Sequence, residues 1–293
     1  MCISRNNVVE AISALGWVAS RNQITILDNL ADKQDITDVT TKILVPTPTG
    51  PGFMIVSSDV NPGLVQRGVD NIRLVKARVG VHCASAILSP ILCGKIDGRS
   101  FAIWERHRPL LSGKGSKRFN RYFYGPRIID WAYLLCAHSL KPAANVPKQF
   151  VVPLQAVRDE AAFPKDMRQQ AGRALDRLDE WRPLQCIQHG DFWEGNVLRS
   201  RQDGGLFVID WAGARENGYP VVDILQMLMS IGCSRRAKDR QIERLCGTLA
   251  CSRDDLTSYT LAALGYLGAN LEYFPVEKYY QISVSVFRYI SQK

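Results

Sequence analysis

The sequence predicts an α+β protein whose first part is rich in strands and whose second part is mainly helical. Residues 22 to about 105 contain short β-branched and aromatic runs, separated by turn sequences such as PTPTGPG and KIDGR. From residue 126 onward, apolar residues recur at helical spacing. A chain of 293 residues is long enough to form one large domain or two lobes.

Four strands and two helices are predicted in the first part. The segment 64–80 carries Val65, Val69 and Ile72 at helical spacing, and the N-terminal segment does the same with Val8 and Ile12. Asn and Glu residues interrupt the N-terminal segment, so it lacks the continuous apolar core of a signal peptide. The predicted strands cover residues 24–27, 40–45, 53–57 and 100–104.

The second part is predicted to form helices on both sides of one central segment that is not helical. In the stretch 164–181, Met167, Ala171 and Ala174 fall on one helix face. We expect the boundary between the two parts to follow the last predicted strand, which gives domains of residues 1–107 and 108–293. The predicted helices lie within residues 126–139, 164–181, 221–233, 240–250, 254–274 and 276–290.

The net charge of +9 raises the question of nucleic-acid binding. The lysines and arginines are scattered, however, and the basic clusters at 114–121 and 234–240 are short. The sequence has neither zinc-finger spacing nor the aromatic signature of an RNA-binding domain. We therefore expect a solvated basic surface that can attract anionic substrates such as nucleotides, with nucleic-acid binding as a third, less favoured alternative.

The eight cysteines form no CxxC pair and lie mostly in apolar runs, as in LLCAH and LSPILCG. This usage is typical of small core residues in a reducing compartment. Apolar runs also stay shorter than a membrane span requires. We expect a cytoplasmic protein that binds neither membrane nor nucleic acid, and the sequence leaves its oligomeric state open.

The segment 188–213, QHGDFWEGNVLRSRQDGGLFVIDWAG, carries the strongest chemical signal. Two strand-like runs, 197–199 and 206–209, flank Asp203-Gly204-Gly205, which is hairpin turn chemistry. Asn196 and Asp210 each lie seven residues from Asp203, so we expect them to face each other at the open end. Directly opposed residues have Cβ atoms about 4.5–5.5 Å apart, and this oxygen pair suits Mg²⁺ or Mn²⁺ rather than zinc.

A second carboxylate, Asp191, lies five residues before Asn196. Beside a phosphate-bound metal it could serve as a base or as an orienting group for an attacking hydroxyl. His189 is expected to brace this loop by hydrogen bonds rather than to transfer a proton. Each of these polar residues also has a structural alternative, as a turn residue or as a helix cap, which stays open here.

The motifs HGDFWEGNVL, VIDW and YPVVDIL resemble those of the aminoglycoside phosphotransferase and choline kinase-like family, small-molecule kinases with a protein-kinase-like fold. The resemblance is close over residues 188–225 and elsewhere rests on architecture. It implies two lobes: an antiparallel-sheet, nucleotide-binding lobe (1–107) and a helical lobe (108–293) for catalysis and substrate binding. It also implies ATP or GTP as co-substrate, Mg²⁺ or Mn²⁺, and a small-molecule hydroxyl as acceptor.

The family's functional residues map by position onto this sequence. Asp191 matches the catalytic aspartate, while Asn196 and Asp210 match the metal ligands. Asp223 matches a later aspartate that supports the catalytic loop. The strand 101–106 would lead into a hinge whose backbone, from about Glu105 to His107, binds the purine.

The first part departs from the family pattern. The third strand, GFMIVSSD, lacks the usual basic residue, and the following helix offers Gly68 or Asp70 where a glutamate is expected. LADKQDIT occupies the place of a Gly-rich phosphate loop. Lys42 on the preceding strand could reach the phosphates instead, although a solvated strand lysine is the simpler interpretation.

The favoured hypothesis is therefore a phosphotransferase that acts on a small-molecule hydroxyl. The alternative is a nucleotide-binding, pseudokinase-like regulatory protein with little or no transfer activity, which the departures from the pattern suggest. An aminoglycoside, a sugar and an amino alcohol all remain open as acceptor. An acidic cleft for a polycationic acceptor could be built from Asp254, Asp255, Glu272 and Glu277.

Overall fold

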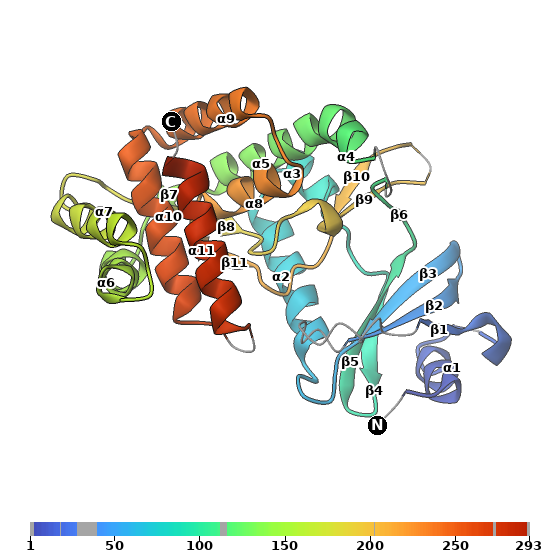
Figure 1. Ribbon diagram of the computed structural model, residues 1–293. Helices are drawn as coiled ribbons and strands as arrows, with labels where there is room; N and C mark the ends of the chain where they lie inside the picture. The colour runs from blue at the N-terminus through green and yellow to red at the C-terminus, as the bar shows by residue number, and fades with distance from the viewer. Residues whose placement is uncertain are drawn as a thin grey trace. The chain divides into compact units, whose positions relative to one another are not determined.

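The computed structural model describes residues 3–17, 19–27, 40–111, 116–201, 203–271 and 274–291. The chain forms two compact units (Figure 1). The first unit comprises residues 1–110 and 195–214, and the second comprises residues 111–194 and 215–293. The domain division between residues 107 and 108 stays a prediction.

Five of the described strands of the first unit form an antiparallel sheet in the order β1-β2-β3-β5-β4. All four predicted strands are confirmed, whereas β4 was missed because Gly94 interrupts its apolar pattern. A side chain at Gly94 would lie 2.9 Å from the ring of Phe101 on β5, so the glycine makes room for that ring. The strands are β1 Thr25–Leu27, β2 Thr41–Thr47, β3 Gly50–Val56, β4 Leu92–Ile96 and β5 Arg99–Glu105.

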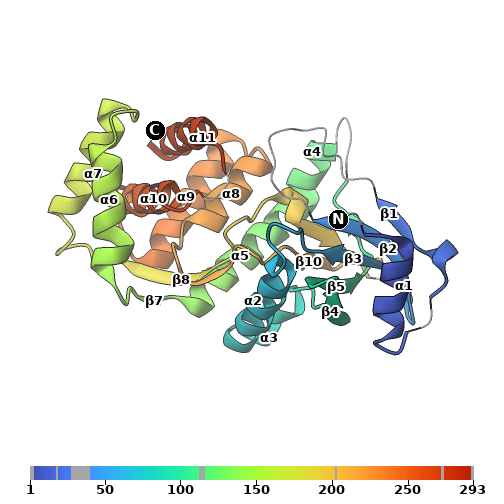
Figure 2. The ribbon, with the colours of Figure 1, turned by 90° about the horizontal axis from the view of Figure 1, so that it is seen from below.

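Helices cover both faces of this sheet. Helix α1 (Arg5–Ser13) buries Val8 and Ile12 against one face. Helix α2 (Leu64–Arg78) buries Val65 and Val69 against the other. Figure 2 shows the two helices on opposite sides of the strands. Strand alternation thus divides the sheet into two apolar layers, as expected for a sheet covered on both faces.

Two buried serines of the sheet fix the start of α2. The helix begins after Gly63, which has no side chain to cap the first backbone N–H groups. Ser57 Oγ accepts a hydrogen bond from Val65 N at 2.9 Å, and Ser100 Oγ accepts one from Gln66 N at 3.1 Å. The two hydroxyl groups are themselves 2.8 Å apart. The sheet therefore supplies the caps that the helix lacks.

Replacing Ser57 with alanine is expected to lower the free energy of unfolding by about 1–2 kcal/mol, because a buried N–H group loses its acceptor. Denaturant unfolding measures this change. Ser85→Ala is the control, since the exposed Ser85 hydroxyl only donates to the His82 carbonyl at 2.9 Å. Equal stability of the Ser57 and Ser85 variants would show that the sheet does not cap α2.

A second, smaller sheet in the first unit has the order β10-β9-β6. The hairpin β9–β10 is more than 100 residues away in the sequence from the segment that follows α3, but the two are hydrogen-bonded. Val208 N donates to Ala86 O at 2.7 Å, and Leu88 N donates to Val208 O at 3.3 Å. The strands of this sheet are β6 Arg108–Pro109, β9 Val197–Arg199 and β10 Leu206–Val208. Helix α3 covers Val81–Ser85, and short helical turns lie at Arg21–Gln23 and Glu194–Asn196.

The second unit is mainly helical, as predicted, and contains a small sheet in the order β11-β8-β7. Helix α6 packs against α7 and α10, and α10 packs against α11. The helices are α4 Ser116–Phe119, α5 Gly125–Ser139, α6 Val152–Asp159, α7 Lys165–Asp176, α8 Val222–Ser230, α9 Arg235–Leu249, α10 Arg253–Gly268 and α11 Val276–Ser291, with π-helical turns at Asn120–Tyr124 and Pro147–Val151. The strands are β7 Lys141–Pro142, β8 Leu184–Gln188 and β11 Arg215–Gly218.

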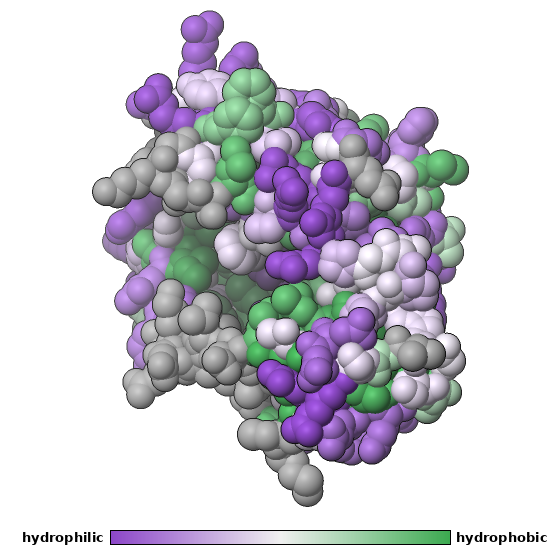
Figure 3. Space-filling model, turned by 90° about the vertical axis from the view of Figure 1, so that its right-hand side faces the viewer, coloured by the Kyte–Doolittle hydropathy of each residue, from purple (hydrophilic) through white to green (hydrophobic). Residues whose placement is uncertain are grey.

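The surface is mixed in character. On the face shown in Figure 3, hydrophilic and hydrophobic side chains are interspersed. This pattern agrees with the scattered charges of the sequence. Among the helices that the structure describes, none is both long and apolar enough to cross a membrane.

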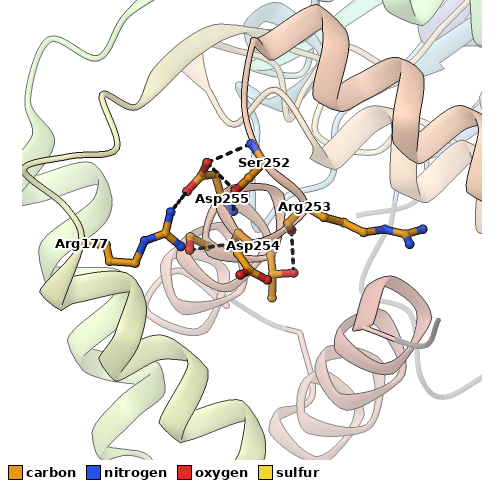
Figure 4. A network of polar contacts seen from close by, with 7 residues as sticks. Arg177, Ser252, Arg253, Asp254 and Asp255 are labelled. Atoms are coloured by element: carbon orange, nitrogen blue, oxygen red, sulfur yellow. Dashed lines mark hydrogen bonds and ion pairs between the residues drawn. The ribbon is translucent and has the colours of Figure 1, made fainter.

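Asp255, one of the acidic residues that could line a cleft for a cationic acceptor, is engaged in contacts at the start of α10. Asp255 accepts hydrogen bonds from Ser252 N at 2.9 Å and from Ser252 Oγ at 2.6 Å (Figure 4). Its other carboxylate oxygen pairs with Arg177 at 2.7 Å. Asp255 therefore caps a helix and joins α10 to the segment after α7, while Glu272 lies outside the described residues.

Candidate functional site

The loop 189–194 follows β8 and is held by Asp223 at the start of α8. Asp223 is buried, and its two carboxylate oxygens accept hydrogen bonds from His189 N at 2.6 Å and Gly190 N at 2.9 Å. Gly190 has a φ of 89°, a left-handed conformation that glycine adopts without the steric cost of a side chain. The carboxylate thus fixes the backbone immediately before Asp191.

Two further side chains of α8 hold the rest of this loop. Gln226 accepts from Phe192 N at 3.0 Å and donates to Gly190 O at 3.3 Å. Ser230 Oγ accepts from Glu194 N at 3.1 Å. Residues 223, 226 and 230 are three and four positions apart and so share one helix face. Gln226 and Ser230 are contacts that the sequence did not indicate.

The loop turns its residues alternately inward and outward. Phe192 is fully buried, and its ring centroid lies 5.4 Å from that of Trp131 and 5.7 Å from that of His189. Asp191 is exposed, and its backbone N–H donates to His189 Nδ1 at 3.3 Å. The buried ring of Phe192 anchors the loop, while the carboxylate of Asp191 is presented on its surface.

Burial raises the pKa of Asp223 to about 6, although its two backbone donors act in the opposite direction. Because the pKa is raised on folding, the contribution of this carboxyl to stability is fully present below about pH 4. That contribution is lost as the pH rises through about 6.

We therefore expect the unfolding free energy of the wild type to fall relative to that of Asp223→Asn between pH 4 and pH 7, by roughly 1–3 kcal/mol. Denaturant unfolding of both proteins at several pH values measures the difference. Parallel stability curves for the two proteins would show that Asp223 keeps an ordinary pKa.

The hairpin after this loop is present, but its predicted register is wrong by one residue. Val197 pairs with Val208 and Arg199 with Leu206. Ile209 N donates to Asn196 O at 3.0 Å, so Ile209 rather than Asp210 lies opposite Asn196. Six residues, 200–205, connect the strands, and the centre of the turn therefore falls before Asp203 rather than on it.

The backbone changes direction at Asp210. Its φ is 65°, a left-handed value that is uncommon for residues other than glycine. In a continued strand, the one-residue offset would place Asp210 and Asn196 on opposite faces, because side chains alternate. The left-handed backbone ends that alternation at Asp210, which directly follows the residue opposite the buried Asn196. Such uncommon conformations cluster at functional sites.

Helix α2 contacts the segment that follows Asp210. Asn71 Nδ2 donates to Trp211 O at 2.8 Å, and Trp211 is almost completely buried. The sequence did not indicate Asn71, although Gly68 and Asn71 share one face of an otherwise amphipathic helix. Where the family pattern expects a glutamate, Asp70 instead pairs with Arg73 at 3.2 Å.

The residues assigned to nucleotide binding lie on the five-stranded sheet or directly after it. Lys42 is exposed on β2. Arg106 N donates to Pro51 O at 3.0 Å, so its N–H group is used within the sheet. Hydrogen bonding alternates along an antiparallel pair, and the backbone groups of Glu105 therefore point away from β3. The neighbouring strand on the other side of β5 is β4, whose first residue, Leu92, pairs with Ile103, two positions before Glu105.

The ring of His107 packs against that of Phe207 in the hairpin, with the centroids 4.4 Å apart and the ring planes tilted by 37°. Burial lowers the pKa of His107. Neither ring nitrogen has a hydrogen-bond partner among the described residues. The segment 30–37, considered as a replacement for the phosphate loop, lies outside the described residues.

These residues fall into two groups. His189, Asp191 and Asp223 lie together in the second unit. Asn196 and Asp210 lie together at one end of the hairpin in the first unit. Residues 134–254, which include both groups, match the sequence model of the phosphotransferase enzyme family. The resemblance to this family is confirmed.

Solved phosphotransferase structures share the fold. A macrolide 2′-phosphotransferase type I is 14% identical over 89% of both chains, with a TM-score of 0.56. A choline kinase from Streptococcus pneumoniae is 15% identical over 94% of this chain and 95% of its own, with a TM-score of 0.57. A spectinomycin phosphotransferase in complex with ADP and spectinomycin is 14% identical over the whole of both chains, with a TM-score of 0.54.

The protein-kinase-like fold predicted from the sequence is confirmed by these likenesses. No curated protein matches the sequence. The phosphotransferase-family match supports a phosphotransferase activity of the chain.

Proposed function

We propose that the protein transfers the terminal phosphoryl group of ATP or GTP to a hydroxyl group of a small molecule. The observation that carries this proposal is the loop 189–194, held through its backbone by Asp223, Gln226 and Ser230. A loop fixed in this way presents one exposed carboxylate, that of Asp191, in a defined position. Phosphoryl transfer depends on such positioning rather than on covalent intermediates.

Asp191 would orient the acceptor hydroxyl and accept its proton. The hydroxyl oxygen forms a bond to the terminal phosphorus, while the bond from that phosphorus to the leaving nucleoside diphosphate breaks. His189 supports this role because its buried ring accepts the backbone N–H of Asp191. Asp223 supports it by fixing the two preceding backbone groups.

Asn196 and Asp210 would hold Mg²⁺ or Mn²⁺. An amide oxygen and a carboxylate are the hard ligands that these ions prefer, and the uncommon φ of Asp210 beside the buried Asn196 fits a functional constraint on this pair. The ion would neutralise charge on the nucleotide phosphates. Two protein ligands leave room for those phosphates to complete the coordination.

The nucleotide base would bind to the sheet of the first unit. Leu44, Phe53 and Trp104 pair with one another across β2, β3 and β5 and are only partly buried. Lys42 lies on the same face as Leu44, because side chains two positions apart share a face. A purine stacked on this row could bond to the backbone of Glu105 or His107, and Lys42 could approach its phosphates.

The acceptor is proposed only by class, as an aminoglycoside, a sugar, an amino alcohol or a similar compound. The structure of the spectinomycin phosphotransferase holds ADP together with spectinomycin. An acidic cleft for a polycation is less well supported here, because Asp255 is engaged by Arg177 and Ser252.

A nucleotide-binding protein without transfer activity is the second candidate. The absence of a basic residue from β3 and of a glutamate from α2 favours it. Incubation with γ-labelled ATP or GTP, Mg²⁺ and a panel of hydroxyl compounds separates the two. Labelled product from any panel member is the expected result, whereas tight nucleotide binding with no labelled product would favour the second candidate.

A further inference from the structure

Helix α2 carries an amide at the place where it meets the metal-binding segment. In protein kinases the corresponding helix contributes a glutamate that pairs with a lysine, and here both residues are missing from β3 and α2. Asn71 Nδ2 instead lies 2.8 Å from Trp211 O, 3.4 Å from Ala212 O and 3.4 Å from Ala214 O. One side-chain amide therefore faces three carbonyl groups that follow Asp210.

A glycine about one turn earlier, Gly68, lies against the same segment. A Cβ atom at Gly68 would lie 3.6 Å from Ala212 N and 3.8 Å from Ala212 Cα. Both distances are ordinary van der Waals contacts, so a side chain at this position would begin in direct contact with the backbone of Ala212. Gly68 and Asn71 thus form one contact surface of α2 for the segment 211–214.

The same segment is also held by a contact with the hairpin that precedes it. Trp211 Nε1 donates to Val208 O at 3.2 Å, and the indole is almost completely buried. Asp210 therefore lies between an anchored hairpin and an anchored turn. An uncommon φ persists only where the surroundings impose it, and these contacts supply that constraint.

We propose that Asn71 is a positioning residue that keeps Asp210 in its metal-binding conformation. This inference rests on the proposed function, because it assigns Asp210 a metal ion. A neutral amide suits the position: its N–H group satisfies carbonyl acceptors without placing a charge beside the metal ligand. Asn71 would thereby fix the metal ligand without the lysine–glutamate pair of protein kinases.

The test is a titration of Mn²⁺ in the presence of ADP, followed by electron paramagnetic resonance. Asn71→Ala is expected to weaken Mn²⁺ binding about tenfold or more, the range typical of groups that orient a metal ligand. Asn71→Asp keeps the size but cannot donate, and it should weaken binding at least as much. Affinity for ADP in EDTA should stay unchanged, which general structural damage would not allow.

Gln66→Ala is the matched control, since this amide on the same helix donates to Asp70 at 2.8 Å, away from the segment 211–214. Gly68→Leu is an independent variant that displaces the segment while keeping Asn71, and it should also weaken Mn²⁺ binding. Wild-type affinity for Mn²⁺ in folded Asn71→Ala, Asn71→Asp or Gly68→Leu protein would overturn the inference. If the wild type bound no Mn²⁺ with ADP, the proposed function itself would fail.

Discussion

Asp191→Asn is expected to lower the rate of phosphoryl transfer by about 10²–10⁴-fold, because the acceptor hydroxyl loses the group that receives its proton. The side chain of Asp191 is exposed, so the free energy of unfolding should change by no more than about 0.5 kcal/mol. Labelled-phosphate transfer and denaturant unfolding of the same preparation measure both quantities.

Asp203→Asn is the control for this variant. Asp203 lies in the hairpin turn, where its carboxylate accepts from Gly205 N at 2.9 Å, and asparagine serves equally well in such turns. Its transfer rate should stay within a few-fold of that of the wild type. A folded Asp191→Asn variant that keeps most of the activity would contradict the assigned role.

Asp210→Gly is expected to separate stability from activity. Glycine adopts a φ of 65° without steric cost, so the unfolding free energy should stay the same or rise by about 1 kcal/mol. The transfer rate should nevertheless fall by at least about 100-fold, because a metal ligand is lost. A residue that is unfavourable for folding but required for activity is typical of functional sites.

Ala250→Gly is the matched control for backbone strain. Ala250 ends α9 with a φ of 47°, so it has the same left-handed conformation without a proposed role in catalysis. Glycine at 250 should stabilise the fold by a similar amount and leave the transfer rate unchanged. Loss of stability in Asp210→Gly with activity retained would mean that Asp210 has a structural role instead.

The fold was predictable because its patterns are local. Helical spacing of apolar residues located α2, α7 and α8, and turn chemistry located the hairpin strands. Strand β4 escaped because Gly94 breaks its pattern, and the need for that glycine lies in the ring of Phe101 on the neighbouring strand. Tertiary packing of this kind leaves no local signal.

The candidate site was predictable as a segment but not as a geometry. Residues 188–213 stood out by composition, yet the register of the hairpin depends on whether its connection has an odd or an even number of residues. The φ of Asp210 and the hydrogen bond from Asn71 to Trp211 depend on packing between segments about 140 residues apart in the sequence. Gln226 and Ser230 become recognisable only once Asp223 is placed, since all three share one helix face.

A double-mutant cycle on Mn²⁺ binding with ADP tests the central claim that Asn196 and Asp210 hold the same ion. Asn196→Ala, Asp210→Gly and the double variant are compared with the wild type. We predict that each single change weakens binding strongly and that the double variant is far less impaired than the sum of the two would require. Strictly additive effects, or wild-type affinity in either single variant, would show that these residues do not share a metal ion.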